Sequence, residues 1–349
     1  MKAICISIIM CTALPAALWG GWVSETVAEG GDVGSCCALA VDRWGRPHIT
    51  YFDKTNNKVV YAKYINSTWE FEDVATGVAV SANTALALDA YDRPHVMFTD
   101  DGEYEMRYAY LSGGSWTTEV VETGDGYGLR VSIAAWPSGP HISYTYAVSM
   151  SVNLKYAYRE GGEWQKETVS GGGLFNKIMM DDQARPHIID YYADGSDLVV
   201  RHSVYDGEEW SDEDIGNGLD SDATQGPDGK IHVSFVKNDN TTLYYAYENG
   251  TDWQTETVGA AKGAPAFTQV CVNGNKDVFI TYFNFDGSDL NVVTKKGSAW
   301  THDVVATGGY VGFPHSTALG PDGYPFIAYY DGTNHSLKLA RYDPLTDVE

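Results

Sequence analysis

Two adjacent positions can be aligned in seven short segments along the chain, and polar or charged side chains occupy them mainly in the last five segments. Together with aromatic rings, such groups bind a polar organic molecule, above all a sugar. If folding gathers the segments, we predict one ligand-binding site, and the alternative is the polar lining of a water-filled channel. The predicted site residues are Arg130, Asn176, Lys177, Asp222, Gln269 and His315, with Tyr127, Phe175 and Tyr310 beside them.

The reactive residues suggest no catalytic mechanism. The sequence has no Ser-His-Asp arrangement, phosphate-binding loop or zinc-ligand spacing, and no carboxylate pair can be assigned the two roles of a glycoside hydrolase. We therefore favour a protein that is not an enzyme, and we expect no cofactor and no metal. Acidic turns such as Asp194–Asp197 and Asp286–Asp289 offer oxygen ligands for Ca²⁺. Their spacing is not that of a calcium loop, so we interpret them as solvated turns.

Tryptophan marks an internal repeat. Seven tryptophans lie 43 to 48 residues apart, and each begins the pattern Trp-x-x-Glu/Asp-x-Val/Ile. Three further strand-like runs lie between successive tryptophans. Four strands in a repeat of about 40–50 residues are typical of a β-propeller blade. The tryptophans are Trp22, Trp69, Trp116, Trp164, Trp210, Trp253 and Trp300.

The order of the strands predicts how the ring closes. We call the strands of a repeat A, B, C and D, with the tryptophan opening strand D. The first strand D precedes every strand A, and the last A-B-C run has no strand D after it. The N-terminal strand must therefore complete the last blade, which leaves no open edge. We predict an all-β protein, a single seven-bladed β-propeller of four antiparallel strands per blade over residues 21–349.

This fold would bring the predicted site residues together. Strand A is innermost and lines the central channel, and the D–A and B–C loops share one end of the disc. The site should lie at that channel mouth, on the D–A loop face. Histidine opens strand B in five blades, at His48, His95, His141, His187 and His232. Because equivalent positions in a ring point in different directions, we interpret these histidines as packing or turn residues rather than as metal ligands.

Charge narrows the choice of partner. The chain has 47 acidic and 23 basic residues, for a formal net charge of −24. This balance repels the phosphate backbone of nucleic acids and anionic membrane surfaces. An aromatic content of 13% argues against general disorder.

The N-terminus has the pattern of a secretory signal peptide, which we assign to residues 1–20. Lys2 is followed by an apolar run from Ala3 to Leu14, which is too short to span a membrane. We expect a secreted monomer, without membrane insertion. Three cysteines remain after the signal, Cys36, Cys37 and Cys271. They are either small buried strand residues or one disulfide, formed between Cys36 and Cys37 or from one of these to Cys271.

The amino-acid sequence of the turn between strands A and B, with the strand residues on either side, resembles that of secreted microbial propellers of the sialidase-like and lectin-like kind. Leu88–His95 and Ala40–Ile49 carry this likeness, and the sialidase Asp-box is absent. The resemblance implies an extracellular propeller associated with glycans, and it transfers no catalytic residue. We predict a non-catalytic binding propeller whose partner is an extracellular glycan or surface protein. The alternatives are a carbohydrate-active enzyme, a lyase or hydrolase using Arg130 and His315, and a structural surface protein.

Overall fold

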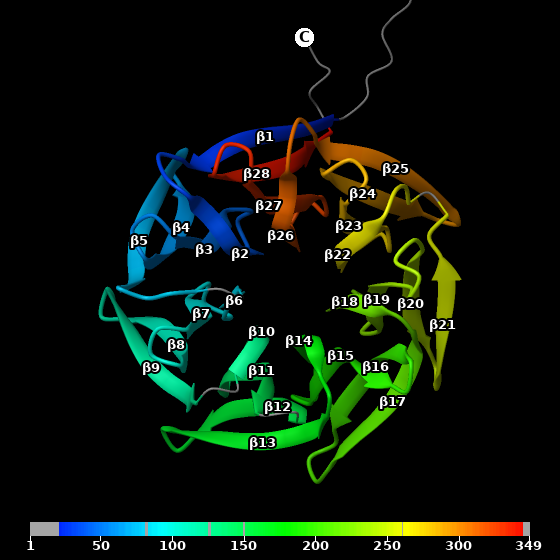
Figure 1. Cartoon of the computed structure of the whole chain (residues 1–349), viewed down its shortest axis with the longest axis horizontal. Coiled ribbons are helices and arrows are strands. Elements are labelled where there is room, and N and C mark those ends of the chain that lie inside the picture. The colour runs from blue at the N-terminus through cyan, green and yellow to red at the C-terminus, as the bar shows by residue number, and fades with distance from the viewer. Residues whose placement is uncertain (1–20, 81–82, 125–126, 149–150, 260, 345–349) are drawn as a thin grey trace, which may run out of the picture.

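The computed structural model describes residues 21–80, 83–124, 127–148, 151–259 and 261–344, and every regular element in these ranges is a β-strand. The predicted signal peptide lies outside the described residues. Seven four-stranded antiparallel sheets surround a central channel (Figure 1). The prediction of an all-β, seven-bladed propeller is confirmed. Among the described residues, no helix is long and apolar enough to cross a membrane.

Each blade runs from an innermost strand A to an outermost strand D. Blade 1 consists of β2 (Val33–Val41), β3 (Pro47–Asp53), β4 (Lys58–Ile65) and β5 (Thr68–Thr76). Blade 2 consists of β6 (Thr84–Leu88), β7 (Pro94–Asp100), β8 (Glu105–Ser112) and β9 (Ser115–Thr123). Blade 3 consists of β10 (Tyr127–Trp136), β11 (Gly139–Val148), β12 (Ser151–Glu160) and β13 (Glu163–Gly171).

The remaining blades repeat this order. Blade 4 consists of β14 (Leu174–Met180), β15 (Pro186–Asp194), β16 (Asp197–Tyr205) and β17 (Trp210–Asn217). Blade 5 consists of β18 (Leu219–Gln225), β19 (Ile231–Val236), β20 (Leu243–Asn249) and β21 (Asp252–Thr257). Blade 6 consists of β22 (Pro265–Val272), β23 (Val278–Asn284), β24 (Asp289–Lys296) and β25 (Ala299–Ala306). Blade 7 consists of β26 (Val311–Leu319), β27 (Pro325–Asp331), β28 (Ser336–Asp343) and β1 (Gly21–Ala28).

The ring closes as the strand order predicts. β1 pairs antiparallel with β28, with Trp22 opposite Tyr342. The first described strand is thus the outermost strand of the last blade, and both ends of the described chain lie at the same edge of the disc (Figure 1). This pairing joins the ends of the ring through backbone hydrogen bonds and covers the edge of β28.

In three of the seven blades, the described structure shows the tryptophan of the repeat hydrogen-bonded to the glutamate of the preceding blade, at Trp116, Trp210 and Trp253. Trp116 of blade 2 packs edge-on against Tyr61 of blade 1, with ring centroids 5.3 Å apart, and its Nε1 donates to Glu72 at 2.9 Å. Trp210 makes the same contact with Glu167, at 3.1 Å. In these blades the repeated motif is therefore an inter-blade contact.

The strand-B histidines are structural. The Nδ1 atoms of His95, His141 and His232 are each hydrogen-bonded at 2.5 Å to a tyrosine hydroxyl on strand C of the same blade. His187 bonds in the same way to His202 at 2.9 Å. Burial lowers the pKa of His141 to about 4, which keeps the ring neutral. Their interpretation as packing and hydrogen-bonding residues is confirmed.

The three cysteines are buried and free. Burial raises the pKa of Cys36 to about 11, so this thiol stays protonated at neutral pH. The interpretation as small buried strand residues is confirmed, and neither of the two alternative disulfides is present.

Candidate ligand-binding site

The innermost strands begin with an irregular turn at the channel mouth. The pairing of strands A and B slips near the start of β2, β10, β14, β18, β22 and β26. Cys36, Phe175, Asp220 and Phe267 adopt φ values between 50° and 56°, in the left-handed region that side chains rarely occupy. These are equivalent positions in four blades. Such strained turns re-aim the side chains that follow, and they cluster at functional sites.

Glycine allows the D–A loops to approach the neighbouring blade. Gly173 has φ +95°, and a Cβ atom there would lie 2.5 Å from the Cβ of Leu154 in blade 3. Gly312 repeats this arrangement against Leu290 of blade 6, where the distance would be 2.6 Å. A larger residue would push the start of strand A away from its neighbour, so these glycines fix where the mouth residues lie.

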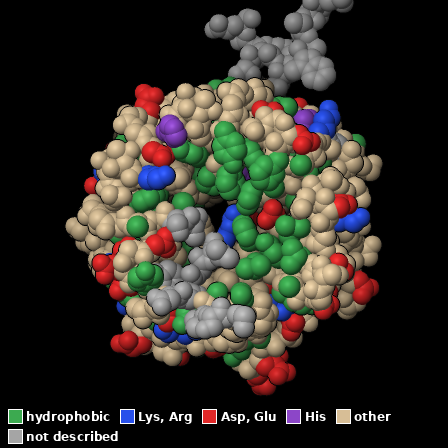
Figure 2. All heavy atoms as spheres, in the orientation of Figure 1, with side chains coloured by type: hydrophobic (Ala, Val, Ile, Leu, Met, Phe, Trp, Pro, Cys, Tyr) green, Lys and Arg blue, Asp and Glu red, His purple; other side chains and the backbone are tan. Residues whose placement is uncertain are grey.

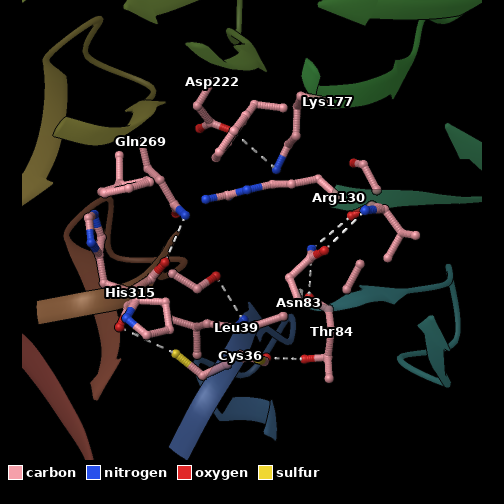
Figure 3. Close-up of a pocket in the computed structure, with 18 of the residues that line it drawn as sticks. Cys36, Leu39, Asn83, Thr84, Arg130, Lys177, Asp222, Gln269 and His315 are labelled. Carbon is pink, nitrogen blue, oxygen red and sulfur yellow. Dashed lines mark hydrogen bonds and ion pairs between the residues drawn. The ribbon is translucent and has the colours of Figure 1, made fainter. Parts of the chain in front are cut away.

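A pocket of about 340 Å³ occupies the channel and is lined by all seven innermost strands (Figure 3). Seven of the nine predicted site residues line it: Arg130, Phe175, Asn176, Lys177, Asp222, Gln269 and His315. Tyr310 lies outside this lining, and the side chain of Tyr127 is outside the described part. The fold therefore brings together the residues that the alignment of the blades predicted. Their contacts show what each side chain can do.

Asn176 and His315 line the pocket, but their polar side-chain atoms form hydrogen bonds within the protein. The Asn176 Oδ1 accepts from Ser143 Oγ at 2.6 Å, and its Nδ2 donates to Thr145 Oγ1 at 3.3 Å. The two ring nitrogens of His315 lie 2.9 Å from the Gly312 carbonyl oxygen and 3.1 Å from Thr281 Oγ1. Burial lowers the pKa of His315 to about 4. These side chains tie strand A to the preceding blade.

Asp222 and Gln269 connect adjacent innermost strands. Asp222 Oδ2 accepts from the Val270 backbone N–H at 3.0 Å, and Gln269 Oε1 accepts from that of Thr317 at 2.6 Å. The Gln269 Nε2 donates to the His315 carbonyl at 2.9 Å. Asp222 also lies 3.7 Å from the Lys177 ammonium. These contacts hold blades 4 to 7 in fixed positions around the mouth.

Arg130 is different, because its guanidinium has no hydrogen bond or ion pair to any residue whose side chain the structure describes. Its side chain reaches from β10 into the channel (Figure 3), where the guanidinium carbon lies 4.3 Å from the Phe175 ring centroid and 5.9 Å from that of Phe267. Burial lowers the pKa of this guanidinium, and the carboxylates of Asp220 and Asp222 oppose the shift. Arg130 remains a cation whose N–H donors are unused among the side chains that the structure describes.

Aromatic rings extend the pocket onto the surface of blades 6 and 7. Phe267 lies 4.2 Å from Phe313 between centroids, and Phe283 lies 5.1 Å from both Phe285 and Tyr310. Phe285 is 52% exposed and Tyr310 41%. Figure 2 shows these hydrophobic side chains beside the central opening, on the side of β22 and β26. The mouth is therefore asymmetric, and Tyr310 belongs to this aromatic rim.

The sequence prediction missed three residues at this site. Phe267 carries the second ring beside Arg130. Asp220 has a raised pKa because it is buried, and it accepts from the Phe267 N–H at 3.4 Å. Asn83 bonds to the backbone of Val131. All three lie one position before the aligned polar residues, so one more column of the same alignment would have found them.

Among the described residues, no three His, Cys, Asp or Glu side chains are grouped closely enough to hold a metal ion. The acidic turns between strands B and C use their oxygens locally. Asp331 Oδ1, for example, accepts from the backbone N–H groups of Thr333 and Asn334 at 3.1 and 3.0 Å. This is the bonding of an ordinary solvated turn.

Comparison with known proteins supports the fold. No protein-family model and no curated protein matches the chain. A lectin of Aleuria aurantia solved with Fucα1-6GlcNAc is 13% identical, with a TM-score of 0.52 over 78% of this chain and 98% of the lectin. A polysaccharide lyase is 12% identical, with a TM-score of 0.56 over 96% of this chain and 94% of the lyase. The hydrazine synthase of Kuenenia stuttgartiensis is 12% identical, with a TM-score of 0.62 over 96% and 99%.

These similarities define a class of fold. The chain is a seven-bladed β-propeller with fold-level resemblance to lectin-like propellers. Its neighbours include a lectin, a polysaccharide lyase and a hydrazine synthase, so the fold by itself assigns no activity. The residues at the channel mouth are what can indicate a function.

Proposed function

We propose that the protein is a secreted, non-catalytic binding propeller that recognises an extracellular glycan at the D–A loop face. The Arg130 guanidinium, which has no hydrogen bond or ion pair among the described side chains, carries this proposal. A sugar offers hydroxyl oxygens as acceptors and an apolar ring face, and Arg130 and Phe175 present the two complementary groups 4.3 Å apart. The lectin and the lyase among the structural neighbours agree with a carbohydrate ligand.

Comparison with the other arginines shows why Arg130 matters. Arg46 and Arg185 bind aspartates of their own turns, and the buried Arg201 lies 2.7 Å from Asp190. Arg341 is also unpaired within the described chain, but it is exposed on β28. Arg130 thus combines partial burial with unused donors. Such a group costs free energy that a ligand with suitable acceptors recovers.

A binding role fits the site better than catalysis. A general base needs a nitrogen or oxygen available to the substrate. Both ring nitrogens of His315 are instead hydrogen-bonded inside the protein, and its side chain is buried. His315 is therefore not available as the general base that the alternative, a lyase or hydrolase, would need.

Two measurements test the proposal. Glycan-array screening should identify a ligand, and calorimetry should show that Arg130→Gln weakens its binding by about tenfold or more, as expected for a lost charged hydrogen bond. The matched control is Arg341→Gln, which removes the same charge from an exposed site and should bind like the wild type. Equal affinity of both variants would contradict the proposed site. Release of unsaturated or reducing sugar from a polysaccharide would contradict the non-catalytic role.

A further inference from the structure

A second cavity lies at the seam where the ring closes. It is a groove of about 560 Å³ between blade 6 and blade 7, bounded by β23, β24 and β25 on one side and by β1, β28 and the β26–β27 turn on the other. We call it the closure groove. The turns between strands A and B and between strands C and D flank it, so it lies on the disc face opposite the channel mouth.

The closure groove exists because blade 6 lacks two tyrosines. Blade 5 carries Tyr245 and Tyr247 on strand C, with ring centroids 5.6 Å apart, and Tyr245 packs under Trp300 of the next blade. Blades 2 and 3 carry the same pair. The residues at these positions in blade 6 are Val292 and Thr294, as the register of β23 with β24 shows. The smaller side chains leave Trp22 without a tyrosine partner on strand C of blade 6, and Phe279 of β23 lines the groove there.

Three aromatic side chains form one wall of the groove. Trp22 packs edge-on against Tyr342, with centroids 5.7 Å apart, and Tyr342 stacks on Tyr324 at 5.2 Å. The Trp22 indole Nε1 is buried and has no hydrogen-bond partner in the described structure. In blades 2 and 4 the equivalent indole donates to a glutamate, but the acidic residue here is Asp303, which is one methylene shorter. The wall therefore offers aromatic surface, while the indole nitrogen itself is buried within it.

The opposite wall carries polar groups of both charges. Lys296, Asp303 and the hydroxyl of Thr294 line it. Within the described chain, Lys296 and Asp303 form no ion pair with each other or with another residue. Their charges cancel, which disfavours a charged ligand, yet together they donate and accept hydrogen bonds. Hydroxyl groups both donate and accept, and the C–H face of a sugar ring is apolar.

We propose that the closure groove is a second carbohydrate site, for a neutral pyranose residue. The ring would lie against Trp22 and Tyr342, and its hydroxyls would bond to the exposed Lys296 and Asp303. This site shares no residue with the channel mouth. Its existence therefore does not depend on the function proposed for Arg130.

The indole N–H of Trp22 provides a direct readout. In a ¹⁵N-labelled full-length protein, the Trp22 cross-peak is identified by its loss in Trp22→Phe. Titration with methyl glycosides of glucose, galactose, mannose and fucose should shift this peak with at least one sugar, because a sugar ring packed on the indole changes the magnetic environment of its N–H. Trp69 supplies the internal control, because its Nε1 is also buried without a partner but its seam is filled by Leu339. Its peak should stay in place.

A filling variant separates binding from folding. Thr294→Tyr restores the residue that blades 2, 3 and 5 carry and should close the groove without loss of stability. It should weaken sugar binding at this site by about tenfold or more, while Arg130-dependent binding is retained. The proposal is wrong if no neutral sugar moves the Trp22 peak at millimolar concentration. It is also wrong if Thr294→Tyr leaves the shift unchanged.

Discussion

At the scale of single residues, the channel mouth divides its side chains between two tasks. Asn176 and His315 occupy the first aligned position and bond to serine or threonine of the preceding blade. Arg130 occupies the same position in blade 3, but its guanidinium has no such partner among the described side chains. The sequence shows that a polar residue stands there. It does not show which one is left unpaired, because that depends on distances between blades.

The tyrosine–histidine pairs allow a test at this scale. The Tyr156 hydroxyl is hydrogen-bonded to His141 at 2.5 Å, whereas Tyr158 only stacks against the same ring. Tyr156→Phe should lower the free energy of unfolding by about 1–2 kcal/mol, because it leaves a buried ring nitrogen unpaired. Urea denaturation measures the change. Tyr158→Phe is the control and should have little effect, and equal effects of the two variants would contradict the structural role of the histidine.

At the scale of strands and blades, the repeat could be predicted from the sequence because every blade carries the same tryptophan motif on strand D. The Trp-x-x-Glu spacing places the two side chains on opposite faces of strand D, so that the tryptophan faces one neighbouring blade and the glutamate the other, as Trp116 and Glu72 of adjacent blades show. The strand count alone predicted the closure by β1. The closure groove was not predicted, although its cause is visible in the sequence. Val292 and Thr294 interrupt a tyrosine pattern, and only the register with β23 shows what their absence exposes.

The inter-blade contact can be measured with a matched pair of variants. Glu167→Ala should cost about 1 kcal/mol of stability, because the Trp210 indole loses its acceptor at 3.1 Å. Glu163→Ala on the same strand is the control, because Glu163 is exposed and forms no hydrogen bond or ion pair within the described structure. Urea midpoints compare the two. An identical midpoint for both variants would argue against a stabilising role for the motif.

At the scale of the whole molecule, the buried histidines make stability depend on pH. Burial lowers the pKa of eight histidines below the ordinary 6.5. The unfolded chain therefore binds more protons than the folded chain below pH 6.5, and stability falls as the pH decreases. Asp190 and Asp220 act in the opposite direction, because burial raises their pKa values, to about 6 for Asp190.

We expect the eight histidines to outweigh the two aspartates. His141 and His315, with folded pKa values of about 4, should each remove up to roughly 1.4 kcal/mol of stability per pH unit between 6.5 and that value, and the other histidines act in the same direction. Urea denaturation from neutral pH down to about pH 4.5 measures the slope. His141→Gln should flatten it. Stability that is constant or rises over this range would contradict the burial of neutral histidines.

The central claim is that Arg130 and Phe175 form the core of a glycan-binding site. A crystal structure with the array-identified glycan tests it most directly. We predict a sugar residue at the channel mouth, with an oxygen within hydrogen-bonding distance of the Arg130 guanidinium and its apolar face toward Phe175, Phe267 or the aromatic rim. A glycan bound elsewhere, with Arg130 still free of ligand contacts, would contradict the account.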